Sequence, residues 1–275
     1  MEITGFPDAL AIGETLAADI AKGIAHANDA GRCYLLGCPG GRSPRATYRA
    51  LAEQVAISRL PLSQLVIVMI DDYVVPNGGS YVLASADAHY SVRRFAAREI
   101  VAPLNSAAEI GRGIIAGHVW FPDPDDAAGY DDRLRAAGGL DLLILASGAS
   151  DGHVGFNPPG TPGDARSRVV KLAESTRRDN MRTFPDFATL DEVPTHGVTV
   201  GIATIAEFAA RAVLVATGTE KQQAVAHLAG ADSYDPAWPA SVVTICRQGS
   251  VYADSAAMHL QPAHYPAPRR GRQFS

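Results

Sequence analysis

The chain has 275 residues, of which 47% are hydrophobic and 19% are charged, enough apolar side chains for the core of one large α/β domain. A formal net charge of -5 and a pI near 5.9 argue against nucleic acid as a partner. Three cysteines without a CxxC pair support neither a disulfide framework nor a zinc site, so we expect a cytoplasmic protein without a metal ion. The first residues carry acids where a secretory signal would carry bases, and no apolar run reaches the ~20 residues of a bilayer span, so we expect no membrane partner.

Continuous apolar runs alternate with helical patterns along most of the chain. Because these runs do not alternate with polar residues, they predict buried parallel strands, at 33–37, 65–70, 140–146, 212–217 and 241–246. Helical patterns lie between them, at 9–29, 43–55, 125–138, 205–211 and 220–230. Such alternation is typical of an α/β fold in which helices cover both faces of a parallel sheet.

Local signals mark the helix starts and the domain limits. We expect Ser43 to cap the second helix with Pro44 at its first position, and Thr219 to form a capping box before the last helix. The sequence has no internal repeat or long linker, so residues 1–260 are expected to form a single domain. Residues 261–275 are rich in proline and arginine and predict an extended tail.

The first of three notable turns at predicted strand ends is GCPGGRSPRATY, residues 37–48. Ligands of open α/β sheets gather at the carboxyl ends of the strands. Gly40 and Gly41 allow a ligand to approach the backbone closely, and the free amides of a helix that starts near Ser43 suit a phosphate. Arg42 could add positive charge. A plain tight turn explains the glycines equally well.

The second turn is MIDDYVVPNGGSY, residues 69–81, where Asp71 and Asp72 end a very apolar strand. Acids in this position are candidates for proton abstraction, because partial desolvation raises the pKa of a carboxyl group toward neutral pH. A helix cap or a solvated loop is the structural alternative. No histidine or third acid stands nearby in the sequence, which disfavours a metal site.

The third turn is SGASDGHVGFNPPGT, residues 147–161, which follows the apolar run LDLLILA. Asp151 and His153 flank Gly152, so the carboxylate can orient the imidazole if the turn folds back on itself. An Asx turn with a solvent-facing histidine is the structural alternative. The serines of this stretch lack a GxSxG context, so no serine nucleophile is indicated.

Taken in order, GGRSP, DDY and DGHVGFN resemble the turns of the glucosamine-6-phosphate deaminase and 6-phosphogluconolactonase superfamily. Further similar segments follow at the deaminase's spacing, namely RRDNMRTF (177–184), VPTHGVTVGIATI (193–205) and ATGTEKQQAV (216–225). The resemblance covers residues 35–230. It implies a modified Rossmann-like fold in three layers, with a parallel, mixed-edge sheet and a hexose 6-phosphate as ligand. Oligomers occur in this superfamily, although no motif here marks an interface.

The resemblance implies a phosphate site built on the turn from Gly41 to Ser43. Arg182 and Lys221 match the family's cationic phosphate ligands, and such an arrangement clamps a dianion between backbone amides and two cations. Without the resemblance, a solvated surface charge would be the better interpretation of both side chains. Other positions within the matching motifs are predicted to contact the substrate, namely Gly40, Arg42, Asp72, Tyr73, Gly152 and Asn157.

The resemblance also implies the catalytic roles. Asp71 would remove a proton from carbon 2 of the opened sugar and return it at carbon 1. His153, oriented by Asp151, would move a proton at the ring oxygen and so open the ring. The products would be a ketose phosphate and ammonia, and neither a metal nor an organic cofactor is implied.

One position departs from the deaminase pattern. Deaminases of this type read FNEP after DGH, and the glutamate completes a proton relay, whereas this chain has Pro158 there. Lactone hydrolysis needs only a base that activates water and a group that stabilises the oxyanion, so this change favours a 6-phosphogluconolactonase. Phe156, Asn157 and Tyr73 favour the deaminase branch, whereas Arg42 is acceptable to the lactonase pattern. We therefore predict a deaminase-like isomerase, with the lactonase as the alternative.

A third hypothesis is a phosphosugar sensor that has lost catalysis. The same fold serves as an effector-binding module in some regulators. The sequence has no evident helix-turn-helix segment with a basic surface, which such a regulator would use to bind DNA.

Overall fold

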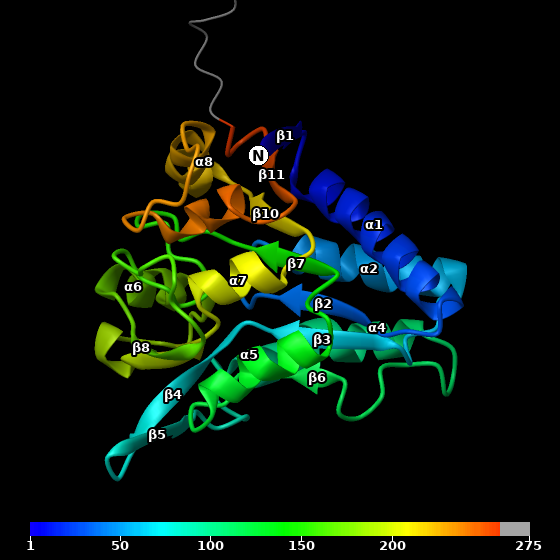
Figure 1. Cartoon of the computed structure of the whole chain (residues 1–275), viewed down its shortest axis with the longest axis horizontal. Helices are drawn as coiled ribbons and strands as arrows, with labels where there is room; N and C mark the ends of the chain where they lie inside the picture. Colours follow the sequence, from blue (N-terminus) through cyan, green and yellow to red (C-terminus); the bar gives the residue numbers. More distant parts are fainter. Residues whose placement is uncertain (259–275) are drawn as a thin grey trace, which may run out of the picture.

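A computed structural model describes residues 1–258 (Figure 1). Within them, seven strands form one sheet in which every neighbouring pair is parallel. In spatial order these strands are β1 (Glu2–Phe6), β11 (Gly249–Asp254), β10 (Ala212–Ala216), β7 (Leu142–Leu145), β2 (Tyr34–Cys38), β3 (Leu65–Met69) and β6 (Val119–Trp120). The prediction of an α/β fold with a parallel sheet is therefore confirmed.

Each face of this sheet packs into its own hydrophobic cluster, because successive side chains of a strand point to opposite faces. In β2, Leu36 packs into one cluster and Leu35 into the other. The first cluster joins the sheet to α1 (Ala9–Asp29), α2 (Arg45–Ser58), α3 (Val92–Phe95), the π-helical segment Ala96–Val101 and α4 (Ala102–Ala107). The second cluster joins it to α5 (Ala127–Ala136), α7 (Ile202–Phe208) and α8 (Gln222–Ala229). The predicted three layers are visible in Figure 1.

Antiparallel pairing is found in a second sheet and not at the edge of the first. Its four strands run in the order β5 (Ser80–Leu83), β4 (Asp71–Asn77), β9 (His196–Thr199) and β8 (Arg168–Lys171). The chain passes from β3 into β4 through Ile70 alone, and the carbonyl of Ile70 accepts a hydrogen bond from the amide of Val200 at 2.8 Å. Asp71 therefore lies where the two sheets meet.

The strand predicted at 241–246 is wrong. Residues Pro239–Thr244 form a 3₁₀ helix, and the last strand, β11, follows at Gly249–Asp254. Val242 and Val243 are fully buried in that helix, so their apolar character reflects burial and not strand pairing. A short apolar run does not distinguish a strand from a buried helical turn.

The two predicted helix caps are also wrong. Helix α2 begins at Arg45 with Pro44 as its N-cap, and the structure shows no side-chain hydrogen bond at that cap. Thr219 opens a short 3₁₀ helix, Thr219–Lys221, that leads directly into α8. The backbone of both turns is instead shaped by glycine, since Gly41 and Gly218 have φ angles of +98° and +88°.

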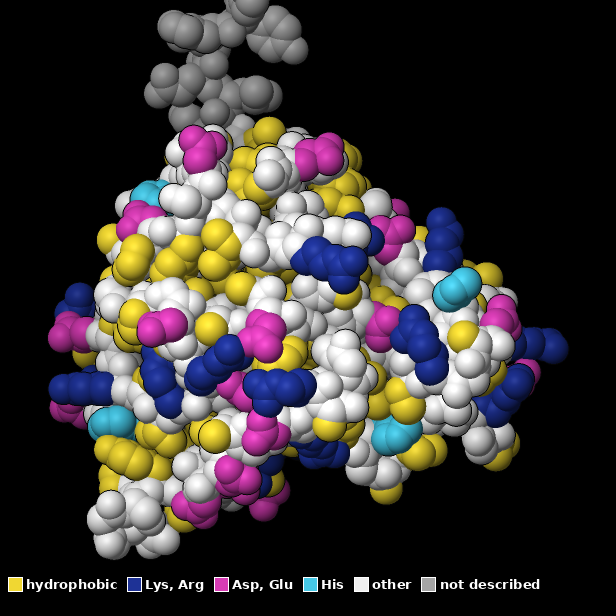
Figure 2. Space-filling view, viewed as in Figure 1, with side chains coloured by type: hydrophobic (Ala, Val, Ile, Leu, Met, Phe, Trp, Pro, Cys, Tyr) yellow, Lys and Arg dark blue, Asp and Glu magenta, His cyan; other side chains and the backbone are white. Residues whose placement is uncertain are grey.

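The remaining elements are short or lie outside the main layers. They are α6 (Glu174–Thr183) and the 3₁₀ helix Leu190–Glu192. No helix within residues 1–258 is both long enough and apolar enough to cross a membrane. On the face shown in Figure 2, acidic and basic side chains are interspersed. The predicted tail, residues 261–275, lies outside the described residues.

Candidate active site

A cavity opens at the carboxyl ends of β2, β3, β7 and β10, where ligands of such sheets bind. The three turns singled out in the sequence all contribute to it, and α6 forms another wall. Its lining comprises Pro39, Gly40, Gly41, Arg42, Ser43, Asp71, Tyr73, Val92, Ala146, Ser147, Gly148, Ala149, His153, Gly155, Phe156, Asp179, Asn180, Thr183, Phe184, Thr217, Glu220 and Lys221.

The glycine turn borders the cavity directly ahead of α2. Gly41 has a φ of +98°, and a Cβ atom built there would meet no heavy atom within 4 Å. Glycine is therefore required by the backbone angle and not by crowding. Arg42 extends from this turn toward the turn after β10, where its guanidinium lies 3.5 Å from the carboxylate of Glu220.

Asp71 is a buried acid in the cavity wall, with 5% of its surface exposed. Burial, and secondarily the neighbouring charge of Asp72, raises the pKa of Asp71 to about 7. A Cβ atom added at Gly155, whose φ is +54°, would lie 3.5 Å from a carboxylate oxygen of Asp71. The DGHVG stretch thus packs closely against this acid, and a carboxyl group with a near-neutral pKa is suited to accept and return a proton.

Asp72, predicted to contact substrate, lies outside the cavity lining. Its carboxylate is fully buried and accepts hydrogen bonds from the amides of Tyr73 at 2.8 Å and Val92 at 3.0 Å. The guanidinium of Arg93 lies 3.3 Å away. Desolvation raises the pKa of Asp72, while these donors oppose the rise. Asp72 therefore ties β4 to the start of α3, and its contact with substrate stays a prediction.

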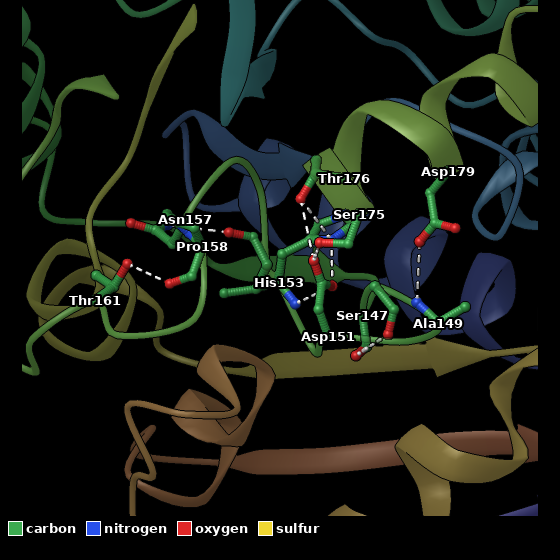
Figure 3. Close-up of polar contacts among 12 residues, drawn as sticks. Ser147, Ala149, Asp151, His153, Asn157, Pro158, Thr161, Ser175, Thr176 and Asp179 are labelled. Carbon is green, nitrogen blue, oxygen red and sulfur yellow. Dashed lines mark hydrogen bonds and ion pairs between the residues drawn. The ribbon is translucent and has the colours of Figure 1, made fainter. Parts of the chain in front are cut away.

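Asp151 holds His153 in the manner that the DGH spacing predicted (Figure 3). A carboxylate oxygen of Asp151 lies 2.7 Å from Nδ1 of His153 and also accepts the amide of His153 at 3.1 Å. Two hydroxyls from the first turn of α6 complete the arrangement, since Ser175 and Thr176 donate to the other oxygen of Asp151. Desolvation favours the neutral acid, but the hydrogen bonds from His153 and Ser175 outweigh it and lower the pKa of Asp151. The imidazole thus reaches the cavity with an ionised acid behind it.

Gly152 and Asn157 support this turn from outside the cavity. A Cβ atom on Gly152 would lie 2.3 Å from the ring of Trp238, and its φ is +64°, so both space and backbone require glycine. Asn157 is fully buried and donates to the carbonyls of Val154 and Val200, at 3.0 and 2.8 Å. Both residues hold the backbone that presents His153, and neither lines the cavity, so their contact with substrate stays a prediction.

Of the two cationic side chains predicted to bind the phosphate, one lines the cavity and the other does not. Lys221 lines the cavity, and its ammonium group donates a hydrogen bond to the carbonyl of Ser147 at 2.7 Å. Desolvation lowers the pKa of Lys221, partly offset by the charges of Asp179 and Glu220. Arg182, on the last turn of α6, is exposed and outside the lining.

Several lining residues on α6 were missed in the sequence, although they lie in the quoted segment RRDNMRTF. Asp179 and Thr183 share one helix face with Thr176, at spacings of three and four residues. That periodicity was the available signal. Phe184 joins Tyr73 and Phe156 to form an apolar wall, with ring centroids 6.2 and 4.9 Å from that of Tyr73.

Within residues 1–258, one group of side chains has the ligand types and spacing of a metal site. Ligand atoms of Asp151, His153 and Asp179 lie within 4.8 Å of one another. Hydrogen bonds already engage both oxygens of Asp151, and the amide of Ala149 donates to Asp179 at 3.3 Å. These contacts explain the cluster without a metal, and we assign none.

Pro158 lies outside the cavity lining, at the start of the turn that leads away from His153 (Figure 3). Its carbonyl accepts hydrogen bonds from the hydroxyl and the amide of Thr161, at 2.7 and 3.1 Å. The partners of His153 in this structure are Asp151 and Thr176, whose hydroxyl lies 3.1 Å from Nδ1. One cavity therefore contains a carboxyl group with a pKa near 7, at Asp71, and an imidazole that is hydrogen-bonded to an acid, at His153. Two cationic side chains, Arg42 and Lys221, line the same cavity.

Comparison with known proteins agrees with this geometry. Residues 7–253 match the family model described as glucosamine-6-phosphate isomerases/6-phosphogluconolactonase. A glucosamine-6-phosphate deaminase of Streptomyces avermitilis is 36% identical, over 94% of this chain and 91% of that protein. One from Bacillus pumilus is 30% identical, over 95% of this chain and the whole of that protein.

Solved structures show the same fold. A monomeric glucosamine-6-phosphate deaminase superposes with a TM-score of 0.77 at 26% identity, covering 94% of this chain and 98% of that one. A 6-phosphogluconolactonase from Shewanella baltica superposes with a TM-score of 0.66 at 18% identity, covering 93% and 98%. The chain belongs to the glucosamine-6-phosphate isomerase/6-phosphogluconolactonase family.

Proposed function

We propose that this protein is a cytoplasmic enzyme that converts a hexosamine 6-phosphate and water into a ketose 6-phosphate and ammonia. The relatives at 30% identity or more that are described above carry the name glucosamine-6-phosphate deaminase. The observation that carries the proposal is Asp71, a buried carboxyl group in the cavity wall with a pKa of about 7. Removing a proton from the carbon next to a sugar carbonyl requires a general base whose pKa lies near the working pH.

The side chains divide the proposed reaction between them. His153, backed by ionised Asp151, moves a proton at the ring oxygen and so opens the sugar. Asp71 takes the proton from carbon 2 while the ammonium group of the sugar gives a proton to the carbonyl oxygen at carbon 1, which yields an enolamine, and Asp71 then returns its proton to carbon 1. The resulting imine at carbon 2 adds water and releases ammonia. Each proton that the base accepts is returned within one turnover, so Asp71 ends in its starting state.

The phosphate of the substrate binds the glycine turn in this proposal. Backbone around Gly40 and Gly41 borders the cavity, and Arg42 and Lys221 provide the cations of its lining. The apolar wall formed by Tyr73, Phe156 and Phe184 lies in the same cavity and limits the access of water to the reacting carbons.

A lactone hydrolase is the second candidate, and the pair of Asp151 and His153 favours it, because an acid-supported imidazole can activate water. That reaction does not require a second base. The lactonase proposal therefore leaves Asp71 and its raised pKa without a role.

The experiment compares ammonia release from glucosamine 6-phosphate with hydrolysis of 6-phosphogluconolactone, for the wild type, Asp71→Asn, His153→Gln and the surface control Glu53→Gln. We expect ammonia release that falls by about 10²-fold or more in Asp71→Asn, a typical effect of removing a general base. The Glu53 control, an exposed acid on α2, should match the wild type. Lactone hydrolysis that survives in Asp71→Asn and is lost in His153→Gln, without ammonia release by the wild type, would establish the lactonase instead.

A further inference from the structure

One of the two cations of the cavity, Arg42, is paired with a carboxylate in this structure. The guanidinium of Arg42 lies 3.5 Å from Glu220, and both side chains are partly exposed, at 45% and 37%. The charges of Asp179 and Glu220 also act on the adjacent ammonium group of Lys221. Two cations therefore face three lining carboxylates, when Asp71 is counted, so the cavity does not have the positive excess expected of a simple anion site.

Glu220 is placed to compete with a bound phosphate. It follows Gly218 and Thr219 in the turn after β10, whereas Arg42 belongs to the glycine turn after β2. Their ion pair thus joins two turns at the carboxyl edge of the sheet. A phosphate dianion that engages Arg42 must share or displace Glu220, and the two like charges repel each other.

We propose that Glu220 neutralises Arg42 in the free protein and weakens the binding of the substrate's phosphate. This inference rests on the proposed function, because it takes the anion to be a sugar phosphate. The repulsion acts equally on substrate and product, since both carry the same phosphate. Glu220 therefore raises KM and eases product release, without contributing to the chemical step.

The first test measures binding of inorganic phosphate to the full-length protein by titration calorimetry at low ionic strength. Because repulsion between partly exposed charges is weak, Glu220→Gln should bind phosphate roughly three- to tenfold more tightly than the wild type. Glu207→Gln is the matched control, because Glu207 is similarly exposed and pairs with Arg166 outside the cavity lining. The control should bind phosphate as the wild type does.

A second test asks whether the effect acts through Arg42. In an Arg42→Gln background, the additional change Glu220→Gln should have a clearly smaller effect on phosphate affinity than it has in the wild type. With the sugar substrate, Glu220→Gln should lower KM by a similar factor. If product release limits turnover, kcat should also fall, and a rise in kcat would contradict a role of Glu220 in product release.

The outcomes separate this inference from the function on which it rests. Equal or weaker phosphate binding by Glu220→Gln, beside a wild type that binds phosphate, would overturn the role of Glu220 and leave the proposed function intact. Absence of phosphate binding by every variant, beside ammonia release by the wild type, would overturn the role of Glu220 alone, whereas absence of both would overturn the proposed function as well. A gain in affinity that persists fully without Arg42 would show that Glu220 acts on the ligand alone, which contradicts the competition described here.

Discussion

Replacing Asp71 with asparagine should abolish turnover and, at the same time, stabilise the fold. Burial raises the pKa of Asp71 from 3.8 to about 7, a difference of about three units. Each unit corresponds to 1.36 kcal/mol between the two protonation states, so ionising this group in the folded protein costs up to about 4 kcal/mol. Asparagine has nearly the same shape and does not ionise.

The stabilisation of Asp71→Asn relative to the wild type should increase as the pH rises. Below pH 3.8 the carboxyl group is protonated in both the folded and the unfolded chain, and its pKa shift has no effect on stability. As pH rises to about 7, the unfolded chain ionises first, and the folded protein loses stability until its own pKa is passed. Asp71→Asn escapes this loss, so its free energy of unfolding should exceed that of the wild type by about 1.5 kcal/mol at pH 5 and by about 4 kcal/mol at pH 8.

Urea denaturation followed by far-ultraviolet circular dichroism at these two pH values measures the effect. Glu53→Gln, which removes an exposed acid, is the control and should differ little from the wild type at either pH. A gain in Asp71→Asn that is the same at pH 5 and pH 8, or a loss of stability at pH 8, would refute the claim that this acid is held at a raised pKa.

Two further predictions concern the pH profile and the DGH turn. Because the base must be ionised, kcat/KM for the sugar phosphate should fall about tenfold per pH unit below the pKa of Asp71 and level off above pH 7, and a flat profile from pH 5 to 8 would contradict this role. Gly152→Ala should destabilise the protein by about 1–3 kcal/mol in thermal denaturation and reduce kcat, because its methyl group would meet the Trp238 ring. Gly160→Ala, where φ is +89° with open space around it, isolates the backbone strain and should cost less than Gly152→Ala.

The main sheet could be predicted from the sequence because its central strands are buried on both faces. Runs such as LVIVM in β3 are apolar at every position, and all five residues are buried. The second sheet had no comparable signal. Its strands include polar residues, as in HGVT of β9, so their pairing depends on tertiary contacts that no local pattern encodes.

The candidate site was predictable to the extent that it lies at strand ends. Gly40, Asp71 and His153 follow three different strands, and the parallel sheet brings those ends together. Glu220 could not be distinguished from a surface acid in the same way, and for Asp179 the only signal was its spacing from Thr176 and Thr183 on α6. Asp179 reaches the cavity because α6 packs across the strand ends, and Glu220 because the turn after β10 places it beside Arg42.

The two acidic motifs show why sequence position alone does not assign a role. Asp71 and Asp72 are adjacent in β4, and successive side chains of a strand point to opposite faces. The carboxyl group of Asp71 therefore lines the cavity and has a raised pKa, whereas that of Asp72 accepts a hydrogen bond from the amide of Val92 at the start of α3. In the DGH turn, Asp151 is surrounded by hydrogen-bond donors that lower its pKa. The raised pKa of Asp71 suits the proton acceptor that we propose there, and the lowered pKa of Asp151 suits the anion that we propose behind His153.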